Sequence, residues 1–518
     1  MIIAAAGGRA MRIRIQAPCR RAERRFRSAW RIQSRRRRVS GGNMDSDSKV
    51  SGHKRGGMAA VLICLFMAML DSSAVNIALP TIAQAYHVDF GLARWVVLSY
   101  MLALTALVLP MGRLADVVGK RNIYVAGIVI FGVGSAACAM PASIASLLLS
   151  RVVQGVGAAI ILALGPALVT ELVPAGERGR AFGIMGAVVA LGVIIGPSAG
   201  GALIAVLGWH SIFWLNIPLC VGAATVAFKH LNRDRPSERP PFDLAGTAAL
   251  VAALTLSLLA LSPGELGFLD ALGGGGIWLA AVLMWLVFVW IERRSGHPIV
   301  EARLFGNAVL SLNLLAAFLS SVSIAATLLL LPFYLQNVLG FAVAKTGLLL
   351  AITPLVLTMA APVSGIMADR FGAHRVIAVG LIIMAIGFVA ASTLSTHSTS
   401  LEFACKFVLV GLGLGLFQSP NNALIMSAAE AGHAGIVSGL LAMTRLMGQT
   451  IGVALVGIIW SWRVFIHEGA ARALAQHQVD ALREVFIGLT VLTLLVLALS
   501  VQSSLCRKRA VASVAPSG

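Results

Sequence analysis

Charged residues are scarce in this chain. Asp, Glu, Lys and Arg make up 12% of its 518 residues, and 58% are hydrophobic, whereas a soluble globular protein carries about 25% charged residues. A membrane crossing takes about 20 apolar residues, so a chain of this length and composition has room for about a dozen or more. The shortage of charge excludes an ordinary soluble fold and favours an integral membrane protein.

Several kinds of site are also missing. The six cysteines are scattered with no CxxC pair, so they predict no disulfide framework and no metal site. No GxxxxGK[ST] loop occurs, which excludes a P-loop ATPase, so any transport must run on a gradient. No HExxH motif or other catalytic set is evident. We therefore expect no enzyme, no cofactor and no metal.

The first 57 residues are strongly basic and include four consecutive arginines, Arg35 to Arg38. Such a charge run is typical of a disordered, solvated tail. Aromatic interleaving and a folded module, which would favour nucleic-acid binding, are both missing, and we expect no nucleic-acid partner. Translation from Met44 or Met58, with the upstream stretch as a leader, is an equal alternative.

Apolar runs bounded by charges, Gly and Pro predict fourteen transmembrane helices. They lie at 58–80, 95–112, 122–140, 145–170, 181–206, 211–228, 243–262, 276–292, 308–336, 346–367, 375–394, 402–428, 436–461 and 485–505. The predicted fold is therefore all-α: a six-helix bundle at 58–230, a cytoplasmic linker at 231–242, a helix pair with its following loop at 243–306, and a second six-helix bundle at 307–505. Residues 1–57 and 506–518 are predicted cytoplasmic tails.

The distribution of Lys and Arg gives the orientation, because basic residues are retained on the inside. They concentrate in alternate loops, such as Arg178 to Arg180 and Arg293 to Arg294, and in the C-terminal tail. We therefore expect both termini in the cytoplasm. The segment 463–484 then lies outside, and its apolar residues at helical spacing predict a helix along the membrane surface, with Arg94 in another outer loop.

Two loops repeat one pattern. GRLADVVGKR at 112–121 and GIMADRFGAHR at 365–375 place Gly, Asp and Gly at the same spacing, with basic residues after them. This repeat predicts two parallel six-helix halves, an architecture of secondary transporters that bind substrate at the interface of the halves. The loops could latch one side shut, or could be topological anchors only. The candidate gating residues are Gly112, Asp116, Gly119, Arg121, Asp369 and Arg370.

Further motifs carry a specific resemblance: LDSSAVNIALP at 70–80, RVVQGVG at 151–157, GVIIGPSAGG at 192–201 and WHSIFWLNIP at 209–218. With the loop at 112–121, they resemble the major facilitator superfamily and, within it, the fourteen-span drug:proton antiporter family. The chain departs from the pattern at Val117, where a basic residue is usual, and at His210, where Arg is common. The resemblance implies a transporter of the plasma (cell inner) membrane, with membrane lipid around it and a periplasmic adaptor protein as an optional partner.

Four ionisable residues stand out inside the predicted spans, away from the first and last residues: Asp71, Arg151, Lys406 and Arg445. Such groups are costly in a bilayer and mark functional sites. Asp71 and Arg151 fall at similar depths, so a helix motion that changes their separation would couple conformation to proton uptake. The resemblance implies the same proton-linked role for both. The alternatives are a hydrogen bond from Asp71 to Ser72, Ser73 or Asn76, and a structural ion pair for Arg151.

The span at 181–206 carries glycines four residues apart, which allow close contact with another helix, and a proline that permits a bend. Close packing alone would explain them, but the resemblance implies an antiporter signature and hence export. The residues concerned are Gly192, Gly196, Pro197, Gly200 and Gly201.

The substrate is less well defined. Candidates to line its cavity are Asn76, Tyr100, Phe318, Gln418 and Arg445, each of which could instead face lipid or another helix. Asp71 is the acidic residue placed deep enough to attract a cationic drug. We expect a transporter that exports small amphipathic or cationic compounds in exchange for protons. The alternatives are a proton-coupled transporter of one metabolite, and a receptor or scaffold without transport.

Overall fold

The computed structural model describes residues 44–174, 177–231, 243–261, 273–295, 305–428, 434–465 and 471–514. Within these ranges the regular elements are all helices, as the apolar runs predict. The predictions for residues 1–43, for most of the linker at 231–242 and for the loop at 296–304 fall outside the described residues.

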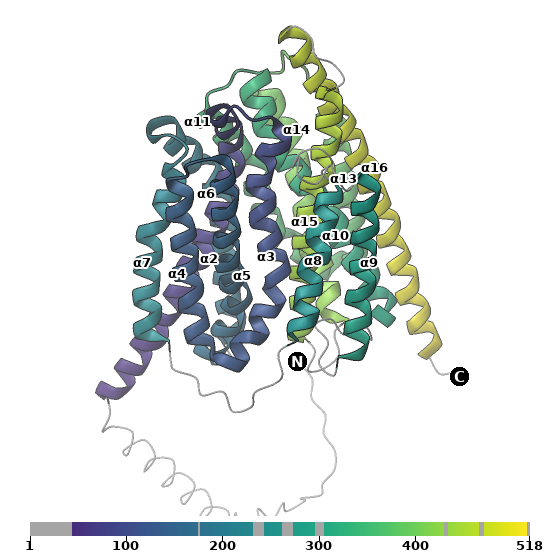
Figure 1. Cartoon of the computed structure of the whole chain (residues 1–518). Coiled ribbons are helices and arrows are strands. Elements are labelled where there is room, and N and C mark those ends of the chain that lie inside the picture. Colours follow the sequence, from purple (N-terminus) through teal and green to yellow (C-terminus); the bar gives the residue numbers. More distant parts are fainter. Residues whose placement is uncertain are drawn as a thin grey trace, which may run out of the picture. The chain divides into compact units, whose positions relative to one another are not determined.

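The N-terminal half consists of six helices that stand side by side in Figure 1. They are α2 (Met44–Tyr86), α3 (Phe90–Val118), α4 (Lys120–Ala139), α5 (Ile144–Leu172), α6 (Arg178–Leu207) and α7 (Ser211–His230). Both α3 and α4 pack along α5, and α7 packs on α4. Helix α5 is therefore central to this half, and it buries Arg151 and Gln154.

The next two helices, α8 (Leu244–Ala260) and α9 (Gly273–Arg294), form the predicted pair and pack on each other. A small cluster of buried apolar side chains joins them to the two halves: it contains Leu250 and Phe288 of the pair, Ala106 of α3 and Met443 of α15. Much of α9 stays uncovered, with Trp278 and Leu286 exposed, as expected of a helix that faces lipid.

The C-terminal half begins with α10 (Ala308–Phe333), which continues into a π-helical turn, η5 (Tyr334–Val338). It goes on with α11 (Val343–Leu350), α12 (Ile352–Phe371), α13 (Ala373–Ala391), α14 (Ser400–Ser427), α15 (Ala434–Phe465) and α16 (Ala471–Val514). Helix α14 packs on α12 and α13, and α10 packs on α15 and α16.

Among the described residues, 13 helical segments are long and apolar enough to cross a membrane, and α11 and α12 together make one of them, Val343–Phe371. The shorter apolar helix Leu244–Ala260 supplies the remaining predicted span. The surface helix predicted at 463–484 is wrong. Helix α16 runs without a break from Ala471 through its span, and Val479 and Leu482 are buried in the core, because their apolar spacing serves packing between helices.

The backbone confirms the repeated loops. Gly119 has φ of 110° between α3 and α4, and Gly372 has φ of 90° between α12 and α13. Only glycine adopts such values readily, because it has no Cβ. The two halves therefore turn with the same local geometry at the equivalent glycine of each repeat.

The two halves meet where α6 packs on α11 and where α3 packs on α15. A Cβ on Gly201 of α6 would lie 2.7 Å from the carbonyl oxygen of Val343 in α11. On α3, Arg94 is completely buried and donates from Nη1 to the carbonyl oxygen of Ala454, at 2.6 Å. The loop position predicted for Arg94 is therefore wrong: α3 begins at Phe90, and its N-cap is Asp89.

Candidate functional site

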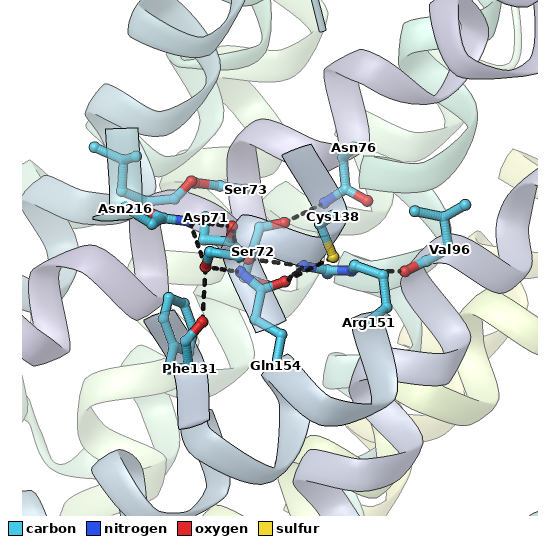
Figure 2. Close-up of polar contacts among 12 residues, drawn as sticks. Asp71, Ser72, Ser73, Asn76, Val96, Phe131, Cys138, Arg151, Gln154 and Asn216 are labelled. Carbon is cyan, nitrogen blue, oxygen red and sulfur yellow. Dashed lines mark hydrogen bonds and ion pairs between the residues drawn. The ribbon is translucent and has the colours of Figure 1, made fainter. Parts of the chain in front are cut away.

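Asp71 of α2 lies at the centre of a buried polar cluster (Figure 2). Its Oδ2 accepts from Nη1 of Arg151 at 2.9 Å, and its Oδ1 accepts from Nε2 of Gln154 at 3.0 Å and from Nδ2 of Asn216 at 2.7 Å. The Asp71 side chain is 0% exposed. Both carboxylate oxygens are thus occupied by donors, and no face of the carboxylate is open to a cationic ligand.

Arg151 of α5 is held from several sides. Its Nε donates to the carbonyl oxygen of Val96 at 3.0 Å, and its Nη1 also donates to Oε1 of Gln154 at 2.5 Å. The guanidinium lies 4.2 Å from the centroid of the Tyr100 ring, a favourable cation–π arrangement. Tyr100 was expected to line a substrate cavity, but it is 1% exposed and packs against Arg151 instead.

Ser135 of α4 completes the cluster. Its Oγ accepts from Nε2 of Gln154 at 2.8 Å and donates to the carbonyl oxygen of Phe131 at 2.9 Å. Through Ser135, Gln154 and Asn216, the cluster joins α2, α4, α5 and α7. Gln154 and Asn216 lie within the motifs at 151–157 and 209–218, whereas no motif in the sequence points to Ser135.

The cluster is organised around the charge of one carboxylate. The Asp71 oxygens accept all three hydrogen bonds, and the guanidinium of Arg151 balances the charge. Protonation of Asp71 would cancel the charge that holds Arg151 and would reduce the capacity of the carboxyl group to accept hydrogen bonds from Gln154 and Asn216. A single carboxylate therefore connects side chains of four helices, α2, α4, α5 and α7.

The glycine stripe of α6 packs on the helix that carries Asp71. A Cβ on Gly192 would lie 2.8 Å from the carbonyl oxygen of Phe66, and one on Gly200 would lie 2.8 Å from the Cβ of Ala74. Gly196, between them, faces Ser73. On a neighbouring face of α6, the Pro197 carbonyl and Gly201 meet α11 of the other half. Helix α6 therefore touches both the Asp71 helix and the opposite half.

The predicted gating loops have a different set of contacts. Lys120 forms an ion pair with Glu171 of α5, and Arg121 donates to the carbonyl oxygen of Phe228 in α7. These contacts lie within the N-terminal half. Asp369 and Arg370 are exposed, Gly112 has open space around it, and the side chain of Asp116 lies outside the described part of the chain.

The remaining cavity candidates divide into two groups. Asn76 is 9% exposed, and its Nδ2 donates to the carbonyl oxygen of Ser72 at 3.2 Å. Phe318, Gln418 and Arg445 are partly exposed.

Comparison with known proteins gives the family. The family model described as Major Facilitator Superfamily matches residues 61–453 and 314–501. The riboflavin transporter RibZ of Clostridioides difficile is 33% identical over 397 residues, which cover 76% of this chain and 86% of RibZ. The multidrug resistance protein Stp of Mycobacterium tuberculosis is 33% identical, over 77% of this chain and 74% of Stp.

One more relative and one solved structure also match this chain. The tetracenomycin C resistance and export protein of Streptomyces glaucescens is 32% identical, over 79% of this chain and 76% of that protein. Among solved structures, an inward-facing bacterial homologue of the human lysosomal transporter Spinster superposes with a TM-score of 0.61 at 16% identity, over 86% of this chain and 96% of that one. The structural match supports the fold. This multi-pass membrane protein is a transporter and not an enzyme, and it belongs to the Major Facilitator Superfamily.

Proposed function

We propose that the protein exports small amphipathic compounds in exchange for protons, from a plasma (cell inner) membrane in which both termini face the cytoplasm. The observation that carries the proposal is the fully buried pair of Asp71 and Arg151. An ion pair held inside a membrane domain marks a proton or ion pathway more often than a stabilising device. The drug exporters among the relatives support export.

The coupling that we propose begins at Asp71. Proton uptake neutralises the carboxylate and weakens the links from α2 to α5 and α7, since those links run through Arg151, Gln154 and Asn216. Helix α2 is then free to shift against the glycine stripe of α6. Because α6 also packs on α11, the shift reaches the opposite half, as alternating access requires.

The gating role of the repeated loops is part of the same proposal. Gly119 and Gly372 allow tight turns, and Arg121 and Arg370 lie just beside these glycines. We propose that Gly112, Asp116, Asp369 and the adjoining basic residues exchange partners when the halves rock.

Proton-coupled transport of one metabolite is the second candidate, and the similarity to RibZ favours it. The two candidates differ in substrate range. A drug exporter moves several unrelated compounds, whereas a metabolite transporter shows saturable flux of one compound that the others do not inhibit.

The test is flux in proteoliposomes with an imposed proton gradient, which an ionophore then collapses. Cationic, neutral and anionic fluorescent dyes and riboflavin are supplied in turn. We expect accumulation that disappears with the gradient. Asp71→Asn should abolish accumulation while Glu177→Gln, at an exposed acid, leaves it unchanged, and Asp71→Glu should restore part of it. Full coupling in Asp71→Asn would remove Asp71 from the mechanism.

A further inference from the structure

Arg445 is a cation within a membrane span and has a neutral partner. It lies on α15 within the span Val437–Ile459, about 12 Å from the first residue of that span at 1.5 Å per residue. Its Nη2 donates to Oδ1 of Asn422 in α14 at 2.6 Å. Within the described part of the chain, no carboxylate forms an ion pair with it. A guanidinium has five N–H donors, so most of its donors remain available.

The position of Arg445 on α15 indicates what it faces. Gly448 and Gly452 mark the face that packs on α10, because a Cβ on either would lie 2.5 Å from a backbone oxygen of α10. Thr450 and Ala454 mark the face that meets α3 of the other half, through bonds to Thr105 and Arg94. At 100° per residue, Arg445 falls between these two faces.

Met443 and Met447 lie on or beside the α3 face and pack into the cluster with α8 and α9. On the other side of that face, between it and the α10 face, Arg445 lies with Ser438 and Ala442, which are exposed, and with Gln449, which is partly exposed. This strip therefore runs between the two halves, where a transporter of this architecture binds its substrate.

The strip carries a positive charge at Arg445, whereas the charge of Asp71 is buried and paired. Asp71 is completely buried and its charge is compensated by Arg151, so it offers no negative field to a substrate. Arg445 is partly exposed, and no carboxylate among the described residues compensates its charge. A cation in a low-dielectric site attracts a negatively charged group strongly.

We propose that Arg445 and Asn422 form a substrate subsite for an anionic oxygen group, a carboxylate or an ionised phenol, on the amphipathic compound. The planar guanidinium suits two oxygens at once, and Gln449 lies one turn further along the same strip. The inference rests on the proposed function for the existence of a substrate, but the subsite can be tested by binding alone. It reverses the charge preference that Asp71 suggests from the sequence.

The experiment measures equilibrium binding of three pyrene probes to the purified full chain in lipid nanodiscs, with empty nanodiscs as the blank. The probes are 1-pyrenebutyrate, 1-pyrenebutanol and 1-pyrenemethylammonium, which share a ring system and differ in charge. We expect the wild type to bind 1-pyrenebutyrate most tightly. Arg445→Gln should raise its Kd at least about tenfold, the loss of one charge-assisted contact, and change the Kd of 1-pyrenebutanol less than about twofold.

Two further variants keep the test decisive. Asn422→Asp leaves Arg445 in place and gives it an internal carboxylate, so it should weaken 1-pyrenebutyrate binding as Arg445→Gln does, without leaving a buried charge unpaired. Arg483→Gln, at an exposed arginine of α16, is the control and should change no Kd. Unchanged 1-pyrenebutanol binding reports an intact fold.

The outcomes separate the two proposals. If Arg445→Gln weakened the binding of all three probes equally and Asn422→Asp changed no Kd, Arg445 would be a packing residue, and the subsite would be overturned. Equal wild-type affinities, or no binding of 1-pyrenebutyrate, would overturn it as well. Charge-selective binding without gradient-driven flux in proteoliposomes would leave the subsite standing and contradict the exchange mechanism.

Discussion

Nη1 of Arg151 lies 2.9 Å from Oδ2 of Asp71, and the two side chains are 1% and 0% exposed. The pair joins α5 to α2 across 80 residues of sequence. Removing one member of a buried pair leaves an uncompensated charge, whereas removing both does not. The energetic coupling between the two residues can therefore be measured from the stability of the protein, without a transport assay.

A double-mutant cycle tests this coupling. We expect Asp71→Asn and Arg151→Gln each to lower the free energy of unfolding by about 3–5 kcal/mol. The double variant should lose less than the sum by at least about 1 kcal/mol, because neither charge is left alone. Denaturant unfolding of the purified protein gives the values, and strictly additive losses would contradict a direct interaction.

The α6 stripe gives a second prediction, with a control on the same helix. A Cβ at Gly196 would press on Ser73, two residues from Asp71, whereas Gly186 has open space around it. We expect Gly196→Ala to cost about 1–3 kcal/mol by overpacking and to lower proton-driven flux at least about tenfold. Gly186→Ala should leave both unchanged. Equal effects at the two positions would show that packing on α2 is not the cause.

Much of the fold could be predicted from the sequence, because lipid demands long apolar runs and the runs are visible. The spans over α13 and α14, for instance, differ from their predictions by three residues or fewer at each end. The surface helix predicted at 463–484 is wrong, because apolar spacing does not identify what a helix faces. Helical apolar spacing there has the same pattern whether the helix faces a membrane surface or, as at Val479 and Leu482, other helices.

The site could be predicted only in part. The placement of Asp71 near Arg151 follows from their depths, but depth does not say which neighbours a helix has. Ser135 joins the cluster because α4 lies beside α5 and α7. Arg94 bonds to the other half because α3 packs on α15. Both are tertiary relations between residues far apart in the chain, and local patterns do not encode them.

The repeated loops give a third prediction. Gly119 and Gly372 have φ of 110° and 90°, where a Cβ causes strain of about 1–3 kcal/mol. We expect Gly119→Ala and Gly372→Ala each to lower stability by that amount. Gly112→Ala is the matched control, since Gly112 is helical and has open space around it, and it should be neutral or stabilise by up to about 1 kcal/mol. Thermal unfolding of the three variants measures these effects. If Gly112→Ala destabilised the protein as much as Gly119→Ala, strain at a positive φ would not be the cause.

The last prediction concerns the contact between the halves at Arg94. Its guanidinium lies directly over Gly457, so a Cβ there would collide with it, and its Nη1 donates to the Ala454 carbonyl. Arg94→Gln and Gly457→Ala should therefore disturb one contact by two routes, each lowering the free energy of unfolding by about 1–3 kcal/mol, the cost of an unsatisfied buried group.

Because the two substitutions act on the same contact, their combination should cost clearly less than the sum. Gly222→Ala, at a glycine with open space around it, is the control and should add independently to Arg94→Gln. The contact also holds the halves together, so a cysteine placed at Thr450, which is 3% exposed, should react faster with a membrane-impermeant thiol reagent in Arg94→Gln than in the parent. Unchanged labelling together with additive energies would mean that Arg94 stabilises α3 alone and does not hold the two halves closed.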